Sequence, residues 1–322
     1  MPSRTARSAP APAGPPAPDP DDAPPAVPPA ARRAILAWYR ERGRPLAFRR
    51  TRDPYAILVS EAMAQQTQAA RAAEAWERFM ERFPTVGSLA AAPLSDALRQ
   101  WAGLGYDRRA RALWQAAGLI VERHGGEVPS AIDELEALPG VGPYTARAVA
   151  ALAHGRRVGA VDVNVRRVLG RVLFGDASSV AAGALQRSAD ASVPAADPGG
   201  WTHALMDLGA TVCKPRNPRC GECPALAWCR YAAVPTQRAQ SATRTVARTV
   251  ALERAVPFHA TNRWLRGRIM DRLRATDGSG WTVVAGPLGM HDAAAVATAL
   301  AGLERDGLVE RDRRGRARLR RA

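Results

Sequence analysis

The chain has 322 residues, enough for one medium and one small domain, each with its own hydrophobic core. Its formal net charge of +16 favours a polyanionic partner, because neutralising phosphates supplies the part of nucleic-acid affinity that does not depend on base sequence. Arginine carries nearly all of this charge, and the only lysine is Lys214, a bias that a GC-rich genome also produces. No apolar run approaches the length of a membrane span, and the first thirty residues lack the apolar segment of a signal peptide.

Residues 1–30 are rich in proline and alanine, and we expect them to be a disordered tail. They hold 11 of the 26 prolines and almost no large apolar side chains, so they cannot bury enough surface to become ordered. From residue 31 the pattern becomes helical, and Ile35, Leu36 and Tyr39 mark a first predicted helix.

A second helix is predicted over residues 55–70, with Asp53 as its N-cap. Glu61 follows Ile57 and Leu58 by four and three residues, so it shares their apolar stripe. Desolvation would raise the pKa of a carboxyl group there, which suits a proton donor. Periodicity alone also allows a solvated glutamate at the edge of the stripe.

Three more helices are predicted over residues 72–83, 94–102 and 108–124. Between the last two lies the loop GLGYDRRAR, residues 103–111. Its Tyr106 is either an ordinary loop aromatic or a base-stacking residue; a tyrosine beside a glycine turn and several arginines is typical of the second.

Residues 138–169 place a tight glycine turn between two helical patterns. Gly140 and Gly142 leave backbone N–H groups exposed at the positive end of the second helix, which predicts a phosphate seat. Asp162 then stands as the N-cap of a further helix over residues 163–172. The apolar positions on either side of the turn are Leu135, Leu138, Val149 and Leu152.

All four cysteines lie within seventeen residues, spaced C-x6-C-x2-C-x5-C. Two disulfides are the alternative without a metal, but the chain shows no secretory signal. Four thiolates in one loop need a cationic centre, and geometry alone permits zinc or an iron-sulfur cluster. The four candidate ligands are Cys213, Cys220, Cys223 and Cys229.

The C-terminal part begins with an arginine- and threonine-rich segment, residues 236–255, that we expect to be a linker. Two helical stripes follow, one with Leu265 and one with Leu300, and short runs at 281–284, 308–310 and 316–319 indicate strands. This order is typical of a winged helix. Residues 311–321 carry seven arginines, which indicates either a wing that contacts a DNA backbone or a disordered basic tail.

Four motifs now occur in a familiar order: SEAMAQQTQ, GLGYDRRAR, PGVGPYTA followed by VDVNVRRVL, and the cysteine spacing. Together they resemble the helix-hairpin-helix DNA glycosylases, and most closely the adenine DNA glycosylases of the MutY type. The resemblance covers roughly residues 31–232. It implies an all-α fold with two helical modules, one at 53–155 and one formed by 31–52 with 156–235, and the winged-helix-like domain at 256–322. It also assigns the cysteines to a [4Fe-4S] cluster.

The resemblance gives four residues catalytic roles. Such enzymes flip a base out of the helix and cleave its sugar bond through a cationic state, which needs one protonated and one ionised carboxyl group. Glu61 matches the acid that protonates adenine, and Asp162 matches the carboxylate that stabilises the sugar cation. Tyr144 would hydrogen-bond this pair, and Asn164 would help to position water.

The same resemblance assigns DNA contacts along the chain. The matching residues are Arg49, Gln65, Gln66, Thr67, Leu104, Gly105, Tyr106, Gly140, Val141 and Gly142. In this set Arg49 reads the flipped base, the glutamines fill the space it leaves, and Tyr106 wedges beside the damaged base. Asp107 departs from the usual second tyrosine of the loop, so the stacking surface there is expected to differ.

Tyr144 occupies the position where related bifunctional lyases carry a Schiff-base lysine, and that route requires an amine nucleophile. The resemblance therefore implies a monofunctional enzyme that acts on double-stranded DNA with adenine opposite 8-oxoguanine or guanine. We expect a monomer in the bacterial cytoplasm, at the nucleoid. A thymine-removing T:G mismatch glycosylase is the enzymatic alternative. A non-catalytic iron-sulfur DNA-binding protein is the other, and it would lack one of the carboxylates.

Overall fold

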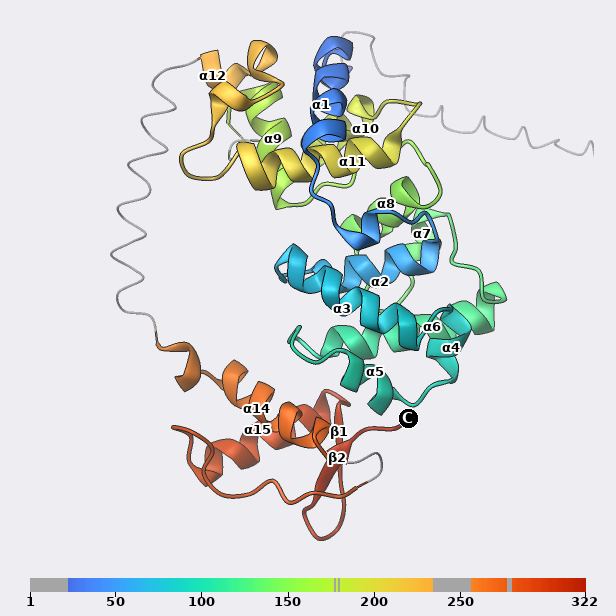
Figure 1. Cartoon of the computed structure of the whole chain (residues 1–322), viewed down its shortest axis with the longest axis vertical. Coiled ribbons are helices and arrows are strands. Elements are labelled where there is room, and N and C mark those ends of the chain that lie inside the picture. The colour runs from blue at the N-terminus through green and yellow to red at the C-terminus, as the bar shows by residue number, and fades with distance from the viewer. Residues whose placement is uncertain (1–22, 177, 179, 234–255, 277–279) are drawn as a thin grey trace, which may run out of the picture.

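The computed structural model describes residues 23–176, 178, 180–233, 256–276 and 280–322. Helices dominate, and the one sheet in these ranges has two short strands, as expected for an all-α protein with a small C-terminal domain (Figure 1). No described helix is long and apolar enough to span a membrane. The helices are α1 (Pro29–Arg42), α2 (Pro54–Ala64), α3 (Ala69–Arg82), α4 (Val86–Ala91), α5 (Leu94–Gln100), α6 (Arg108–His124), α7 (Ile132–Glu136), α8 (Pro143–Leu152), α9 (Val163–Phe174), α10 (Ala182–Ser192), α11 (Pro198–Asp207), α12 (Arg230–Ala233), α14 (Asn262–Arg274) and α15 (Ala293–Arg305).

The helix starts follow local capping chemistry. Asp53 caps α2 by accepting hydrogen bonds from the N–H groups of Tyr55 and Ala56, at 3.1 and 3.3 Å, as predicted. The helix predicted to run to residue 70 instead ends at Ala64, because Gln66 takes a left-handed conformation with φ of 54°. The short helix α4 was not predicted, since six residues are too few for a clear apolar period.

The described chain is ordered earlier than expected at its N-terminal end. Helix α1 begins at Pro29, and Val27 is buried, with its N–H donating to Ser192 Oγ at 2.9 Å. A single buried valine among prolines thus ties residues 23–28 to α10. The rest of the predicted tail, residues 1–22, and the whole of the predicted linker, residues 236–255, lie outside the described residues.

The apolar side chains form two separate cores. One lies among helices α2 to α8, with Phe79, Phe83 and Trp101 fully buried. The other lies among α1, α9, α10 and α11, with Ile35 and Trp201 at its centre. In Figure 1 the α9–α11 helices form the top of the molecule and α2–α8 its middle. A cleft between two independently packed bodies is a common place for a site.

The C-terminal domain packs on the α2–α8 body and shares its core. Leu265 and Ile269 of α14 and Leu300 of α15 belong to the same continuous apolar cluster as Trp101. Strands β1 (Val309–Arg311) and β2 (Ala317–Leu319) pair antiparallel, as predicted. The third predicted strand, at residues 281–284, is reduced to one isolated bridge between Thr282 and Ala317.

Candidate active site

The glycine turn between α7 and α8 has the geometry of a helix-hairpin-helix. Leu135, Leu138, Val149 and Leu152 are all buried, so the two helices pack across it as predicted. Gly140 has a φ of 78°, and a Cβ there would lie 2.8 Å from the Cβ of Ala112 on α6, so only glycine fits. Gly142 is the N-cap of α8, with open space around it. A ligand backbone can therefore approach the first turn of α8 closely.

Glu61 lies on α2 and only 8% of it is exposed, so the solvated alternative is wrong. Burial raises the pKa of its carboxyl group to about 7; a hydrogen bond with Tyr144 lowers this pKa, the charge of Asp162 raises it, and that of Arg49 lowers it. The carboxyl group is therefore partly protonated at neutral pH.

Asp162 caps α9, as predicted, and its two oxygens are held at defined positions. Oδ1 accepts from the N–H groups of Asn164 and Val165 at 2.9 and 2.7 Å. Oδ2 accepts from the side-chain amide of Asn164 at 2.8 Å. Asn164 thus orients the carboxylate directly; its predicted role towards water stays a prediction.

Tyr144 lies in the first turn of α8, which is the third helix that contributes to the site. Desolvation and then the charges of Glu61 and Asp162 raise the pKa of its hydroxyl well above the usual value. The hydroxyl is therefore a neutral donor at any physiological pH, and it also contacts the sulfur of Met206 at 3.9 Å. Three helices, α2, α8 and α9, bring together the three groups that the sequence predicted from separate motifs.

Arg49 lies near Glu61, but its guanidinium is engaged by a residue that the sequence did not single out. Its Nη1 and Nη2 donate to the two oxygens of Asp207 at 2.5 and 2.7 Å, and the Asp207 side chain is fully buried. Arg44 completes the group, with Nε at 2.6 Å from Asp207. An aspartate within the apolar helix WTHALMDL was the available signal, the same one that marked Glu61. The base-reading role of Arg49 stays a prediction.

Arg109 on α6 is a second residue that the sequence missed. It donates to the carbonyls of Ala62 at 2.9 Å and Gly105 at 3.1 Å, and also to that of Gln65. One side chain thus holds two loops together: the one after α2, with Gln65, Gln66 and Thr67, and the wedge loop, with Leu104, Gly105 and Tyr106. The predicted DNA-contacting side chains of both loops therefore lie near each other.

Within these loops the predicted residues differ in exposure. Tyr106 is 39% exposed and takes a left-handed conformation with φ of 51°, whereas Leu104 is buried. Gln65 donates its side-chain amide to Thr145 Oγ1 at 3.3 Å, which places it beside the start of α8. The exposed aromatic ring is thus displayed by a conformation that non-glycine residues rarely adopt.

The cysteines converge on one place although their loop has little regular structure. All four are free, which rules out the disulfide alternative in this structure, and all four line one pocket with apolar side chains between α9 and the loop. Burial, and then the neighbouring cysteine charges, raise the pKa of the Cys223 thiol to about 12, so thiolates there require a cationic group. Among the described residues, no three such ligands are arranged for a single metal ion.

A chain of hydrogen bonds runs from the site to the cysteine loop. Arg167 donates to the side-chain oxygen of Asn164 at 2.8 Å and to the carbonyl of Cys213 at 2.7 Å. Arg171, one turn later, donates to the Cys213 sulfur at 3.4 Å. The amide that orients Asp162 is therefore itself held by an arginine that is attached to the first cysteine.

The fold and this site define the class of protein: residues 59–188 match the family model of the HhH-GPD superfamily base excision DNA repair proteins. The chain is 43% identical over 249 residues to the adenine DNA glycosylase of Mycobacterium tuberculosis, covering 76% of this chain and 78% of that one. It is 39% identical over 284 residues to that of Mycolicibacterium smegmatis, covering 88% and 93%. The chain belongs to the adenine DNA glycosylase family.

More distant relatives agree on the fold. The human adenine DNA glycosylase is 42% identical over 211 residues, covering 62% of this chain and 39% of the longer human one. A thermostable thymine-DNA glycosylase superposes with a TM-score of 0.59 at 30% identity, covering 63% of this chain and 94% of that one. A trapped endonuclease III–DNA covalent intermediate superposes with a TM-score of 0.55 at 25% identity, with the same coverage.

Proposed function

We propose that this enzyme hydrolyses the N-glycosidic bond of adenine that is mispaired with 8-oxoguanine or guanine in double-stranded DNA. The observation that carries this proposal is the pair of unlike carboxyl groups where α2, α8 and α9 meet. Glu61 is buried, with its pKa raised to about 7, whereas Asp162 is fixed by three hydrogen bonds. Cleavage of a sugar bond through a cationic state requires one acid and one carboxylate in this relation.

In the proposed reaction adenine is flipped out of the duplex, because the enzyme cannot reach its sugar bond inside the stack. Glu61 donates its proton to N7 of adenine, which makes the base a neutral leaving group. The bond from the base to C1′ then breaks, and Asp162 stabilises the positive charge on the sugar until water adds to C1′ and gives up a proton, which restores the acid form of Glu61. Tyr144 donates to Glu61, and the Asn164 amide keeps Asp162 in position.

We further propose that the enzyme is monofunctional. Strand cleavage by the related lyases needs an amine that attacks C1′, and the group at this position is the phenol of Tyr144, whose pKa is raised. The only lysine, Lys214, belongs to the cysteine loop. Purified enzyme should therefore leave an intact abasic strand that breaks only after alkali; efficient nicking at neutral pH would contradict this.

The four cysteines would hold a [4Fe-4S] cluster. The residues fit this group, because four partly buried cysteines line one pocket and their thiolates need a cationic partner. When bound, the cluster supplies positive charge that keeps the thiolates together and so orders the loop. Hydrolysis of a glycosidic bond requires no electron, so the proposed role of the cluster is structural or redox-sensing rather than catalytic.

The DNA is proposed to lie across the hairpin and the two loops that Arg109 holds. Gly140, Val141 and Gly142 seat a phosphate, Gln65 and Gln66 enter the space that the flipped base leaves, and Thr67 beside them contacts the DNA. Leu104, Gly105 and Tyr106 form the wedge. We place the enzyme, as a monomer, at the bacterial nucleoid.

A substrate panel tests the proposal. Under single-turnover conditions adenine should be released from A:8-oxoguanine and A:G duplexes, and thymine should remain in T:G; preferential release of thymine would overturn it. Asp162→Asn should abolish release but keep duplex binding, because asparagine preserves the cap and removes the charge. Asp53→Asn, which alters another capping aspartate in the same way, is the matched control and should keep full activity.

A further inference from the structure

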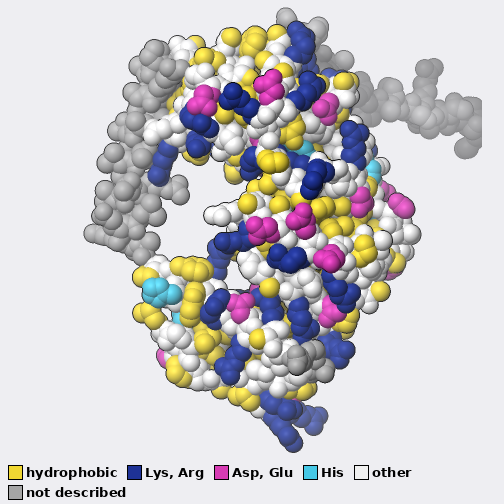
Figure 2. Space-filling view, viewed as in Figure 1, with side chains coloured by type: hydrophobic (Ala, Val, Ile, Leu, Met, Phe, Trp, Pro, Cys, Tyr) yellow, Lys and Arg dark blue, Asp and Glu magenta, His cyan; other side chains and the backbone are white. Residues whose placement is uncertain are grey.

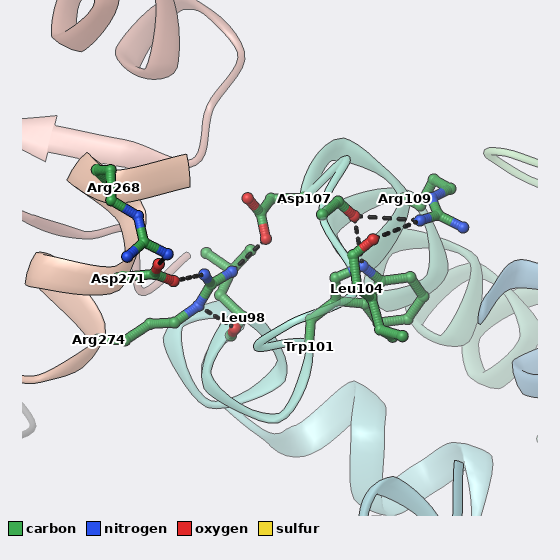
Figure 3. A network of polar contacts seen from close by, with 9 residues as sticks. Leu98, Trp101, Leu104, Asp107, Arg109, Arg268, Asp271 and Arg274 are labelled. Carbon is green, nitrogen blue, oxygen red and sulfur yellow. Dashed lines mark hydrogen bonds and ion pairs between the residues drawn. The ribbon is translucent and has the colours of Figure 1, made fainter. Parts of the chain in front are cut away.

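Asp107, the residue that departs from the resemblance, anchors the C-terminal domain to the wedge loop. Its carboxylate accepts a hydrogen bond from Arg274 of α14, and each side chain of this ion pair is only 10% exposed (Figure 3). Arg274 also donates from Nε to the carbonyl of Leu98 at 2.9 Å. Arg274 also pairs with Asp271 of its own helix at 3.1 Å, so a tyrosine at position 107 would remove the one ion pair that joins Arg274 to the wedge loop.

Further contacts fix the domain in the same position. Arg99 donates to the carbonyl of Thr276 at 3.3 Å, and the N–H of Leu94 donates to the carbonyl of Arg321 at 3.1 Å. The shared apolar core adds a large buried area beneath these bonds. The domain is therefore held in a fixed orientation relative to the wedge loop.

This orientation places Arg263, in the first turn of α14, on the wedge itself. Its guanidinium carbon lies 4.1 Å from the centre of the Tyr106 ring, and Arg109 lies 5.5 Å from the same centre. Arg263 is exposed, and within the described part of the chain no hydrogen bond or ion pair engages its guanidinium. Its five N–H donors are free for a ligand, while the ring restricts where they point.

The space beside this stack is large enough for a nucleotide. A pocket of about 630 Å³ lies between the wedge loop and α14, and it is lined by Tyr106 and Arg263 together with Arg71 and Arg108. In the space-filling view the molecule is hollowed between the α9–α11 body and the C-terminal domain, and arginine or lysine side chains lie along part of this concave edge (Figure 2). The domain thus extends the surface on which we place the DNA.

We propose that Arg263 contacts the base opposite the excised adenine and contributes to opposite-base specificity, with Asp107 and Arg274 as its positioning residues. This inference rests on the proposed function, in which Tyr106 enters the stack beside that base. A guanidinium stacked on the inserted ring directs its N–H fork towards neighbouring base edges. Guanine offers such a fork the acceptors O6 and N7. In 8-oxoguanine N7 carries a hydrogen and donates, so the acceptors there are the carbonyl oxygens O6 and O8. A pyrimidine opposite adenine lacks this pair of acceptors.

The test compares Arg263→Ala with the wild type on adenine opposite 8-oxoguanine, guanine and cytosine. We expect single-turnover rates to fall about 10-fold or more on the two purine partners, as for loss of one bidentate base contact, and to stay unchanged opposite cytosine. Equal losses on all three duplexes would indicate a phosphate contact and overturn the proposal, as would no loss at all. Arg272→Ala, an exposed arginine on the same helix that does not line the pocket, is the control and should behave like the wild type.

Two more variants test the roles of the guanidinium fork and of its positioning residue. Arg263→Lys keeps the charge but loses the fork, so purine preference should remain impaired; full rescue by lysine would overturn the base contact. Asp107→Asn should reduce the same preference, and Arg263→Ala added to it should cause little further loss; independent, multiplying losses would contradict the positioning role. If the wild type releases no adenine from any duplex, the proposed function fails; if it does and Arg263→Ala is unaltered, only this inference fails.

Discussion

The α2–α8 body meets its two neighbours in different ways. Towards α9–α11 the apolar cores stay separate, and polar groups such as Glu61, Tyr144 and Asp162 occupy the junction. Towards the C-terminal domain the cores merge, and the polar contacts are ion pairs around an apolar centre. The difference indicates that the first junction holds reactive groups, whereas the second holds the C-terminal domain rigidly on the α2–α8 body.

Two buried carboxylates at the first junction also differ in how they are paired. Asp207 is gripped by Arg44 and Arg49, whose hydrogen bonds outweigh desolvation and lower the pKa of its carboxyl group. Within the described ranges Glu61 has no such direct ion pair, and desolvation raises its pKa to about 7. A group that must exchange a proton is therefore left without a direct cationic partner, while its neighbour is fully paired.

Glu61→Gln should have the largest effect. Loss of the acid should reduce adenine release by about 10³-fold or more, because glutamine cannot donate a proton to the leaving base. In the wild type the single-turnover rate should fall as the pH rises above about 7, the pKa of Glu61, because the acid becomes ionised. A rate that rises steadily between pH 6 and 9 would contradict the assignment.

The same residue gives a test of stability. Because the pKa of Glu61 is raised in the folded state, its contribution to stability is complete below the unfolded value of 4.5 and is lost as the pH rises through about 7. Glu61→Gln should therefore resist denaturant better than the wild type at pH 8.5, although it is inactive. A variant that is less stable at this pH would indicate that Glu61 holds the junction together.

Asp207→Asn should have the next largest effect, and this effect is on the stability of the fold. It leaves Arg44 and Arg49 without a buried counter-charge, and the free energy of unfolding should fall by about 3–5 kcal/mol. Because the pKa of Asp207 is lowered, the stability that it supplies should be present at neutral pH and lost on acidification. Denaturant titration measures this, and Asp96→Asn, whose ion pairs with Arg82 and Arg99 are solvent-accessible, should cost less than about 1 kcal/mol.

Leu300→Ala tests whether the C-terminal domain shares its core with the α2–α8 body. The variant should lose about 2–5 kcal/mol, and hydrogen exchange should show α5 and α15 losing protection together, because one core spans both. Leu185→Ala, in the α9–α11 core, should lower protection there first. If α15 opened alone while α5 stayed protected, the merged-core description would be wrong.

Arg109→Lys should have the smallest effect, about 1–2 kcal/mol in DNA binding. Lysine keeps the charge but cannot donate at once to the carbonyls of Ala62, Gln65 and Gly105, so the two loops should separate. Fluorescence anisotropy with a labelled duplex measures the affinity. The exposed Arg272→Lys is the control, and an unchanged affinity for Arg109→Lys would show that the loops hold their shape without it.

Local patterns predicted much of this molecule. Caps at Asp53 and Asp162, the stripe that contains Glu61 and the glycine turn each depend on residues within a few positions of one another, so they can be recognised in one dimension. The pairs that join distant elements were not predicted. Arg49 and Asp207 are 158 residues apart in the sequence, and Arg274 and Asp107 are 167 apart. Local sequence patterns do not indicate contacts over such separations.

The close approach of Gly140 to Ala112 fixes the distance between the glycine turn and the Tyr106 loop. Ala112 belongs to α6, and Arg109 at the start of the same helix holds the wedge loop. The proposed phosphate seat and the Tyr106 loop are thus both held by α6. In the proposed DNA complex, the distance between them would be fixed, so a strand shifted by one nucleotide could contact the seat or the Tyr106 ring but not both.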